Sequence, residues 1–474
     1  MRRAALIGLV GMSLLIAASL MHGPTDPDYF WHRAAGQLIL QTGALPDVDS
    51  FSFTRFGAPW IADQWLAELL ITAVSAIGVG WGLALFGFLA GIGILALMLV
   101  LVARGATVSA IATAAVPALW LCGLYATMRP QVLSWSILGV ELALLCVVTP
   151  RTKWLALLLV PLFALWANLH GLWVVGLGVG FTYVAFTLGG HTPMASRRSW
   201  VVVIGLLSAA AVVVTPYGLR GIAYIWNFAD LGDWGAQHLA EWQSPNFHDP
   251  AVLPLLGLIL AIVVLGNRNT ESWLAAIAYF GVALSLYAVR NAPVAGVLAM
   301  PLVASELTAR RWPRRPRRPR GPASSLVRGR AVIEAIAASA VIVAALWIGL
   351  AHYDPSQQTR DRFPVAGVDR LAQVMPDARV LAHYGWGGYV IDRMTKAGAH
   401  VFVDGRNHLY GDGLLNEYSA IVAGDSGWER LVAKYRVTAI LIRPDAPLVH
   451  GIAENAGWCE AYRDPLQVLL LRDC

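Results

Sequence analysis

The sequence predicts an α-helical polytopic membrane protein of about eleven transmembrane helices, followed by a small soluble α/β domain. Hydrophobic residues make up 57% of the 474 residues and charged residues 14%, whereas a soluble globular protein carries about 25% charged residues. Long uncharged runs such as 81–103 and 331–351 cause the shortfall, and runs of about 18 apolar residues are typical of membrane-spanning helices. These runs end near residue 352, which predicts a bundle at 1–351 and a separate domain at 352–474.

The predicted helices alternate with short basic loops. Apolar segments lie at 4–21, 81–103, 106–126, 132–149, 154–169, 171–189, 199–216, 252–266, 272–288, 292–308 and 331–351. Because Lys and Arg gather in cytoplasmic loops, a cytoplasmic N-terminus with Arg2 and Arg3 inside places the loop 22–63 outside. The same alternation puts a set of basic residues inside: Arg104, Arg151, Lys153, Arg197, Arg198, Arg268 and the loop 310–330. The domain 352–474 is then extracytoplasmic.

The stretch 65–79 is nearly long enough to span the membrane. A full crossing there would break the alternation of basic loops, so we expect a juxtamembrane or half-inserted helix that carries Glu68.

The net charge of +6 does not indicate nucleic-acid binding. Residues 310–330 hold nine arginines and no acidic residue, so the rest of the chain is net negative. The loop is too rich in proline for a regular helix. We interpret it as a cytoplasmic segment that fixes topology and contacts anionic membrane lipid.

The same topology gathers the polar residues on the outer side. They lie in the first loop, in three turns and in the outer loop 217–250: Asp26, Asp28, His32, Arg129, Gln131, His170, Arg220, Glu241 and Arg290. Ionisable groups near a membrane are costly unless they are paired or functional. The sequence therefore predicts a functional site at this face.

Asp26 and Asp28 directly follow the first apolar segment, in the order Asp26-Pro27-Asp28-Tyr29-Phe30-Trp31-His32. Two such carboxylates can bind a divalent cation or act as a general base. Alternatively, an aspartate before a proline is a typical helix N-cap. Both interpretations hold if Asp26 caps the helix and Asp28 faces the site.

Arg129 and Arg290 are placed at outer helix ends, where a guanidinium suits a phosphate. The alternative is that both side chains simply extend to the interface. His170 precedes Gly171 between two closely spaced segments, where it either reaches the site or forms part of the turn.

The C-terminal domain alternates predicted strands at 378–382, 400–403, 438–442 and 467–471 with helical patterns at 387–394, 414–422 and 427–435, which favours an α/β layer. Asp404 and Arg406 follow a predicted strand, a usual place for a binding site, although the two can also form an internal ion pair. Cys459 and Cys474 both lie in this domain and can pair if it is extracytoplasmic.

The layout resembles the GT-C superfamily of membrane glycosyltransferases. Asp26-Pro27-Asp28-Tyr29-Phe30 stands where those enzymes carry a motif of the type Asp-Glu-x-x-Tyr, with Pro27 where many of them have Glu. More closely, the chain is similar to a poorly characterised bacterial group of membrane proteins. That group shares a Gly-x-Pro-Trp segment, here 57–60, and a tail with Trp-Gly-Gly-Tyr and Asp-Gly-Arg, here 386–389 and 404–406.

The resemblance implies transfer of a sugar from a polyprenyl-phosphate donor to a cell-envelope glycan or protein acceptor outside the bacterial plasma membrane. Asp28 or Asp26 would deprotonate the acceptor hydroxyl. Arg129, Arg290 or a bound divalent cation would offset charge on the leaving lipid phosphate.

Two alternatives of other classes remain at this stage. One is a carrier for a lipid-linked or anionic solute, which predicts ionisable residues deep inside the bundle, where Glu141 is the one acid well inside a predicted span. The other is a non-catalytic assembly protein built on the same scaffold.

Overall fold

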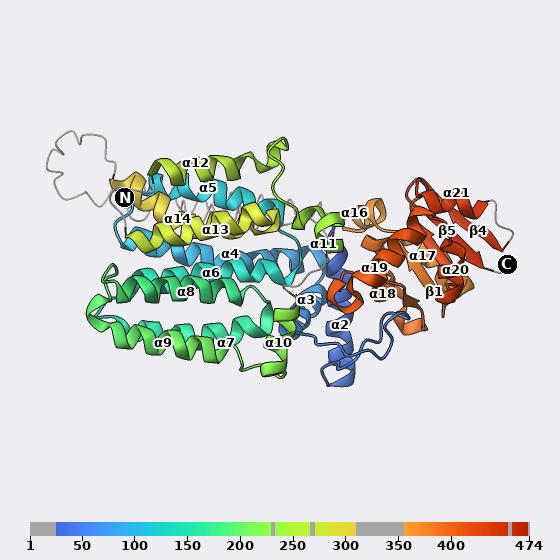
Figure 1. Cartoon of the computed structure of the whole chain (residues 1–474), viewed down its shortest axis with the longest axis horizontal. Helices are drawn as coiled ribbons and strands as arrows, with labels where there is room; N and C mark the ends of the chain where they lie inside the picture. Colours follow the sequence, from blue (N-terminus) through green and yellow to red (C-terminus); the bar gives the residue numbers. More distant parts are fainter. Residues whose placement is uncertain (1–24, 229–232, 266–270, 310–354, 454–456, 473–474) are drawn as a thin grey trace, which may run out of the picture.

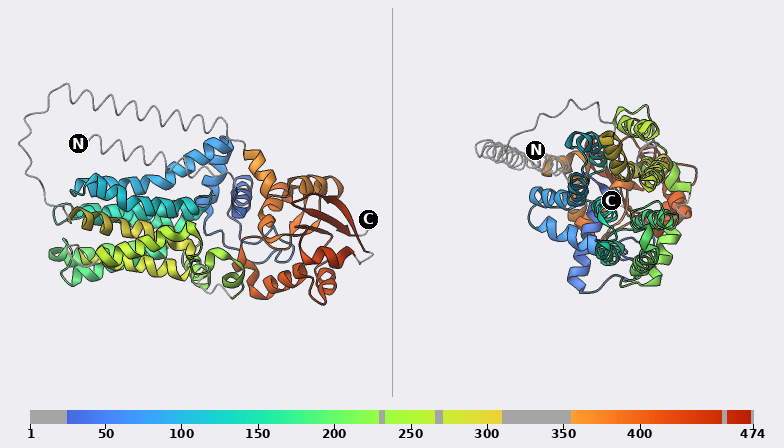
Figure 2. Two further views of the ribbon diagram at one scale, coloured as in Figure 1. Left: turned by 90° about the horizontal axis from the view of Figure 1, so that it is seen from above. Right: turned by 90° about the vertical axis from the view of Figure 1, so that its left-hand side faces the viewer.

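The computed structural model describes residues 25–228, 233–265, 271–309, 355–453 and 457–472. A bundle of roughly parallel helices forms one end of the molecule, and a sheet with covering helices forms the other (Figure 1). The first loop and α2 lie between them, and a second view gives the same arrangement (Figure 2). The described chain is thus mostly helical with a small sheet in its C-terminal part, and the domain boundary near residue 352 stays a prediction.

The bundle contains a helix in each predicted apolar segment that falls within the described residues. These are α4 (Val79–Ala103), α5 (Val108–Leu124), α6 (Pro130–Val147), α7 (Leu159–Leu169), α8 (Trp173–Leu188), α9 (Arg198–Ala211), α12 (Leu253–Leu265), α13 (Ser272–Tyr287) and α14 (Ala292–Ala309). Three described stretches are long and apolar enough to cross a membrane: Leu85–Ala103, Pro130–Val147 and Val289–Ala309. The predicted segments 4–21 and 331–351 and the loop 310–330 lie outside the described residues, so the total of about eleven spans stays a prediction.

Two helices close the bundle on the side of the sheet domain (Figure 1). α2 (Pro27–Thr42) begins at Asp26, whose Oδ1 accepts the backbone N–H of Asp28 at 2.9 Å. The predicted N-cap with proline at the first helical position is therefore confirmed. α3 (Trp65–Ala76) packs against α2. Its 12 residues are fewer than the roughly 20 that a full crossing needs, which agrees with the predicted short helix.

The loop 217–250, predicted to lie on the outer side, also reaches this junction. It contains α10 (Leu219–Phe228), α11 (Asp233–His238) and the 3-10 turns η3 (Ala240–Trp242) and η4 (Pro250–Val252). α11 packs against α19 (Asn407–Ala423) of the C-terminal domain. The loop thereby connects the bundle to that domain and carries Glu241 between them.

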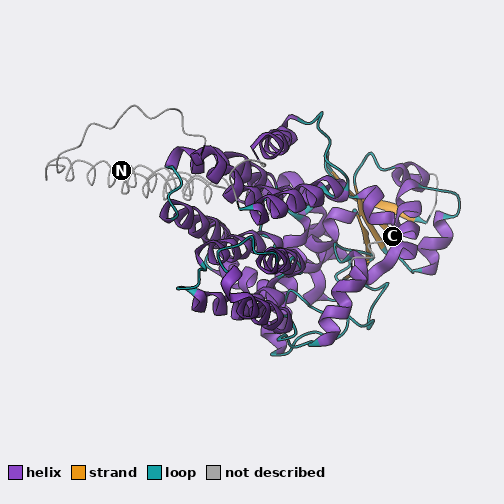
Figure 3. Ribbon diagram, turned by 60° about the vertical axis from the view of Figure 1, so that its left-hand side comes forward, coloured by secondary structure: helices purple, strands orange, loops and turns teal. Residues whose placement is uncertain are grey.

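The C-terminal domain is built on a five-stranded sheet in the order β2-β1-β3-β5-β4, drawn in orange in Figure 3. Its strands are β1 (Arg379–Ala382), β2 (His400–Val401), β3 (Ala439–Ile442), β4 (Trp458–Arg463) and β5 (Val468–Arg472). β1 pairs in parallel with β2 and β3, whereas β5 pairs antiparallel with β3 and β4. The surrounding helices are α16 (Pro355–Arg362), α17 (Val365–Val374), α18 (Gly387–Met394), α19 (Asn407–Ala423), α20 (Trp428–Lys434) and α21 (Pro447–Ala453). The four predicted strands are present, and β4 is a strand that the sequence pattern did not predict.

The first loop extends this sheet at the β2 edge. Ser52 forms a parallel bridge with Val401. Phe53 donates its backbone N–H to the Val401 carbonyl at 3.0 Å, and Val401 donates to the Phe51 carbonyl at 3.1 Å. These bonds satisfy backbone groups that an open sheet edge would leave unpaired. The first loop and the C-terminal domain therefore form one continuous unit.

Candidate functional site

Arg129 is the centre of a charged cluster at the junction of bundle and domain. Pro130 occupies the first position of α6 and disfavours helical geometry for the residue before it, so Arg129 stays extended at φ −120° and ψ 148°. Its guanidinium forms ion pairs with Asp28, with Asp26 at 3.4 Å and with Glu241 at 2.9 Å. Residues more than one hundred positions apart thus meet at one helix terminus, where the helix dipole also favours negative charge.

The two aspartates of the cluster differ in how their oxygens are occupied. Asp26 caps α2 through one oxygen and accepts the Thr127 hydroxyl at 2.8 Å through the other. Asp28 accepts the indole N–H of Trp31 at 3.1 Å and pairs with Arg129. Burial raises the pKa of Asp28 to about 6, because desolvation and the neighbouring carboxylates outweigh the attraction of Arg129. Asp28 is therefore the carboxylate suited to exchanging a proton near neutral pH.

Arg290 provides a second guanidinium beside the first. It donates to Glu241 at 3.2 Å and to the side-chain oxygen of Gln131 at 2.9 Å, and it lies 4.2 Å from the centre of the Trp242 ring. Burial by itself would raise the pKa of Glu241, but the charges of Arg129 and Arg290 outweigh it and lower that pKa to about 2. The Glu241 carboxylate thus bridges two guanidinium groups, an arrangement that also suits a phosphate.

Two histidines lie close enough for the positive charges of these arginines to affect their pKa values. His32 is buried, with Nδ1 3.5 Å from a Glu68 oxygen. The His170 ring nitrogen Nδ1 accepts the backbone N–H of Leu172 at 3.2 Å and lies 3.1 Å from the Ser134 hydroxyl. Burial, reinforced by the positive charge of Arg129, lowers the pKa of His32, and burial with Arg290 and Arg129 lowers that of His170 to about 3. Both rings are neutral at physiological pH.

Asp404 and Arg406 form the internal ion pair that was one of the two sequence alternatives. Arg406 Nε and Nη2 donate to the two Asp404 oxygens at 2.8 and 2.7 Å, and Nη1 lies 2.8 Å from Asp49 Oδ1 in the first loop. The side chains have no exposed surface. Trp60 covers the guanidinium at 4.6 Å. We name these three charged residues, Asp49, Asp404 and Arg406, the interdomain clasp. A direct contact of Asp404 or Arg406 with substrate stays a prediction.

Glycines of the two C-terminal motifs bring the domain directly against the start of α2. A Cβ on Gly405 would lie 2.0 Å from Asp28 Oδ1, and a Cβ on Gly388 would lie 2.6 Å from the Pro27 carbonyl. Only glycine allows such close approach of two backbones. The contact is reinforced by an ion pair between Arg33 of α2 and Asp392 of α18. The C-terminal domain thus forms one wall of the cluster around Asp28.

The chain is similar in fold to several solved structures. ArnT from Cupriavidus metallidurans, bound to undecaprenyl phosphate, superimposes with a TM-score of 0.55 at 14% identity over 98% of this chain and 97% of that one. The arabinofuranosyltransferase AftD from mycobacteria gives 0.56 at 15% identity over 99% of this chain, which spans 40% of AftD. The chain has the GT-C fold.

The chain is also similar to a third solved structure with the GT-C fold. AglB, the archaeal oligosaccharyltransferase from Archaeoglobus fulgidus, in complex with an inhibitory peptide and a dolichol-phosphate, gives a TM-score of 0.53 at 12% identity over 92% of this chain and 69% of that one. No protein-family model matches the sequence, and no curated protein matches it. At these identities the likeness establishes the GT-C fold and leaves the reaction to be argued from the residues.

Within this GT-C fold most of the predicted site residues come together. Asp26, Asp28, Arg129, Gln131, Glu241 and Arg290 are linked by direct contacts. Arg220 is exposed on α10 and has no ion-pair partner among the described residues, so the structure does not bring it into this cluster. Thr127 and Ser134, which hold Asp26 and His170, were not predicted. Their one sequence signal is proximity to Arg129, two and five positions away.

The predicted divalent cation lacks a matching ligand set in the described part of the GT-C fold. No group of three or more His, Cys, Asp or Glu side chains that could hold a metal ion occurs there. Asp26 and Asp28, the predicted ligands, already share the Arg129 guanidinium. The positive charge beside them comes from the two arginines, and we derive no step through a metal.

Proposed function

We propose that this chain is a membrane glycosyltransferase that transfers a sugar from a polyprenyl-phosphate donor to a hydroxyl group of a cell-envelope glycan or protein. The observation that carries the proposal is Asp28, a half-buried carboxylate with a pKa raised to about 6, placed beside two guanidinium groups at the junction of a GT-C fold. The likeness to ArnT and AglB, whose structures contain undecaprenyl phosphate and dolichol-phosphate, supports a lipid-phosphate donor.

Asp28 acts as the general base in this proposal. A carboxylate oxygen of Asp28 accepts the proton of the acceptor hydroxyl. At the same time the acceptor oxygen bonds to the anomeric carbon of the donor. The bond between that carbon and the phosphate oxygen breaks, and its electron pair stays with the lipid phosphate. Trp31 and Arg129 hold the carboxylate in one orientation throughout.

Arg129 and Arg290 stabilise the leaving phosphate. Their side chains are 20% and 16% exposed, so both can be reached from the site. The Glu241 carboxylate lies between them, and a phosphate there would replace it as an anion whose oxygens also accept hydrogen bonds from both guanidinium groups.

We assign the lipid chain of such a donor to an open, largely apolar groove on the bundle. It has a volume of about 490 Å³ and lies between α3, α7 and the segment after α9. Its lining is Trp65, Leu66, Ala164, Leu165, Asn168, Val214, Thr215 and Pro216. In this groove Asn168 accepts the indole N–H of Trp65 at 2.9 Å, and His170 follows two residues later as the C-cap of α7.

The function is tested by donor turnover in lipid nanodiscs. Purified protein is incubated with a panel of polyprenyl-phosphate sugars, and release of the lipid phosphate is followed by chromatography. We expect release with at least one donor in the presence of envelope glycan or protein acceptor. Absence of release with every donor, despite donor binding measured in parallel, would contradict catalysis and favour an assembly protein or a carrier.

The rate of transfer is expected to depend on pH through Asp28. Its pKa is raised from 3.8 to about 6, so the carboxylate is ionised above pH 6 and becomes protonated below it. Turnover should therefore be constant above this value and fall about tenfold per pH unit below it, since only the ionised form accepts a proton. The profile of kcat/KM against pH measures this, because it reports the pKa values of the free protein. A profile that stays flat down to pH 4 would exclude Asp28 as the base.

Gly405→Ala should disturb Asp28 directly. The added methyl group would lie 2.0 Å from Asp28 Oδ1 and 3.0 Å from Trp31 Nε1, so the carboxylate must leave its position. We expect at least a tenfold loss of turnover, because catalytic geometry tolerates little displacement. Gly413→Ala is the matched control in the same domain, since a Cβ there meets nothing within 4 Å. Equal activity of the two variants would contradict the assigned contact.

The proposed location is the bacterial plasma membrane, with the N-terminus cytoplasmic and the C-terminal domain extracytoplasmic. The disulfide at Cys459 supports an oxidising compartment for that domain; its predicted partner Cys474 lies outside the described residues. A cysteine introduced at Asp377, which is exposed, should react with an impermeant maleimide from outside intact spheroplasts. Reaction only after lysis would reverse this topology.

A further inference from the structure

Glu141 is a buried acid in the middle of α6, away from the charged cluster. Its side chain has no exposed surface, and neither carboxyl oxygen has a hydrogen-bond partner among the described residues. A buried carboxyl group without any partner is costly. This orphaned group therefore points to a ligand that satisfies it.

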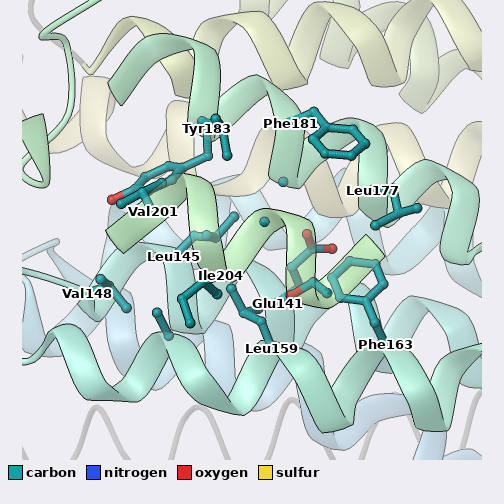
Figure 4. A pocket seen from close by; sticks show the side chains of 15 residues that line it. Glu141, Leu145, Val148, Leu159, Phe163, Leu177, Phe181, Tyr183, Val201 and Ile204 are labelled. Carbon is teal, nitrogen blue, oxygen red and sulfur yellow. The ribbon is translucent and has the colours of Figure 1, made fainter. Parts of the chain in front are cut away.

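A small cavity adjoins the Glu141 carboxyl group. It has a volume of about 30 Å³, is partly open, and is lined mainly by residues of α6, α7, α8 and α9. Figure 4 draws Glu141 among side chains that are mostly apolar, with Phe163 and Leu159 nearby and the Tyr183 hydroxyl at the far end of its ring. Ser208 also lines the cavity, is buried, and has a hydroxyl oxygen without a described partner. The volume is enough for one or two water molecules.

The lining decides which species can occupy this cavity. It contains no Lys, Arg or His side chain, so an ionised Glu141 would be an uncompensated charge inside an apolar bundle. A metal cation would need about six oxygen ligands, whereas the side chains of the lining supply only the oxygens of Glu141, Ser208 and Tyr183. A neutral carboxylic acid needs only a few hydrogen-bonding partners, since it donates one hydrogen bond and accepts others.

We propose that Glu141 is the proton-binding residue of a small hydrated site inside the bundle, where it stays neutral and hydrogen-bonds to water shared with the Ser208 hydroxyl. This site lies outside the Arg129 cluster and does not depend on the proposed sugar transfer. Its ligands are a proton and one or two water molecules.

Two glycines of α8 leave the space that this arrangement needs. A Cβ on Gly176 would lie 3.0 Å from one Glu141 oxygen and 2.3 Å from Trp166, whereas a Cβ on Gly180 would lie 3.6 Å from the other oxygen. Gly180→Ala is therefore compatible with packing, but its methyl group takes volume from the cavity. It serves as a variant that removes water while Glu141 remains.

Infrared spectroscopy of the full chain in lipid nanodiscs tests the proposal. The spectrum of the wild type minus that of Glu141→Gln at pH 7 should contain the C=O stretch of a protonated carboxyl group, shifted in D2O. A carboxylate stretch in its place would overturn the proposal. Gly180→Ala and Ser208→Ala should each move the C=O band to higher frequency through loss of a hydrogen bond, and an unmoved band in both would overturn the water site. If Glu141→Gln fails to fold, the shift of the C=O band in these two variants still tests the proposal.

A hydrophobic carbodiimide gives an independent readout. The carboxyl proton moves to one carbodiimide nitrogen, the carboxyl oxygen bonds to the central carbon, and acyl migration to the other nitrogen leaves a stable N-acylurea without a leaving group. We expect mass spectrometry to find this adduct on Glu141 in the wild type at pH 7. Modification confined to other acids, in protein whose bundle the reagent demonstrably enters, would contradict a neutral Glu141.

Discussion

Asp28→Asn is expected to reduce sugar transfer by about 10²–10⁴-fold, the usual contribution of a general base. The amide retains the shape of the carboxylate and can still accept the Trp31 N–H at its oxygen, but it cannot take a proton from the acceptor. Arg290 and Glu241 keep their contacts, so the KM for the lipid-phosphate donor should change little. Steady-state kinetics with separate kcat and KM values measure both expectations.

Asp26→Asn is the matched control for this variant. Asparagine caps a helix about as well as aspartate, so α2 should keep its start and Thr127 should keep a partner. We expect a loss of turnover well below that of Asp28→Asn. A larger loss in Asp26→Asn, with both variants folded, would transfer the role of base to Asp26.

The composition of the loops was enough to predict that these charges lie at one end of the bundle. Arg129, Glu241 and Arg290 are far apart in sequence, yet the alternation of basic loops put all three on the same side. The N-cap at Asp26 was also predictable, because it depends on two adjacent residues. The N-cap depends on neighbouring residues, and the side on which each loop lies depends on the alternating direction of successive helices. Both can be derived from a single sequence.

Pairings between distant segments were not predictable in the same way. Arg33 with Asp392 and Arg406 with Asp49 each join the first loop to the C-terminal domain, and nothing local identifies the partner. β4 was missed for a related reason, because it is an edge strand with half-buried residues and an irregular register, which weakens the period-two pattern.

The interdomain clasp explains why the C-terminal domain holds its position against Asp28. Arg406 forms ion pairs with both Asp404 and Asp49, and none of the three side chains has exposed surface. A buried charge cluster is not by itself strongly stabilising, but it becomes costly when one member is removed. The clasp thus makes the position of the first loop, and with it α2, depend on the domain.

Arg406→Met should therefore destabilise the protein severely. The substitution keeps an apolar stem beneath Trp60 but leaves two buried carboxylates without a counter-charge, which costs about 3–5 kcal/mol. We expect a lower Tm in thermal unfolding and faster proteolysis of the first loop. Replacing Asp404 by Leu in the same chain should restore part of the loss, since it removes one of the uncompensated charges.

Arg393→Met provides the control, because Arg393 pairs with Asp369 at 3.4 Å with both side chains about half exposed, 50% and 52%. Exposed pairs contribute only about 0–1 kcal/mol, so this variant should unfold close to the wild type. Equal Tm values for the two methionine variants would mean that the clasp does not hold the domain. If instead Arg406→Met alone loses stability and turnover together, the position of the first loop governs both, because the clasp fixes the loop that leads from Asp28 to the sheet.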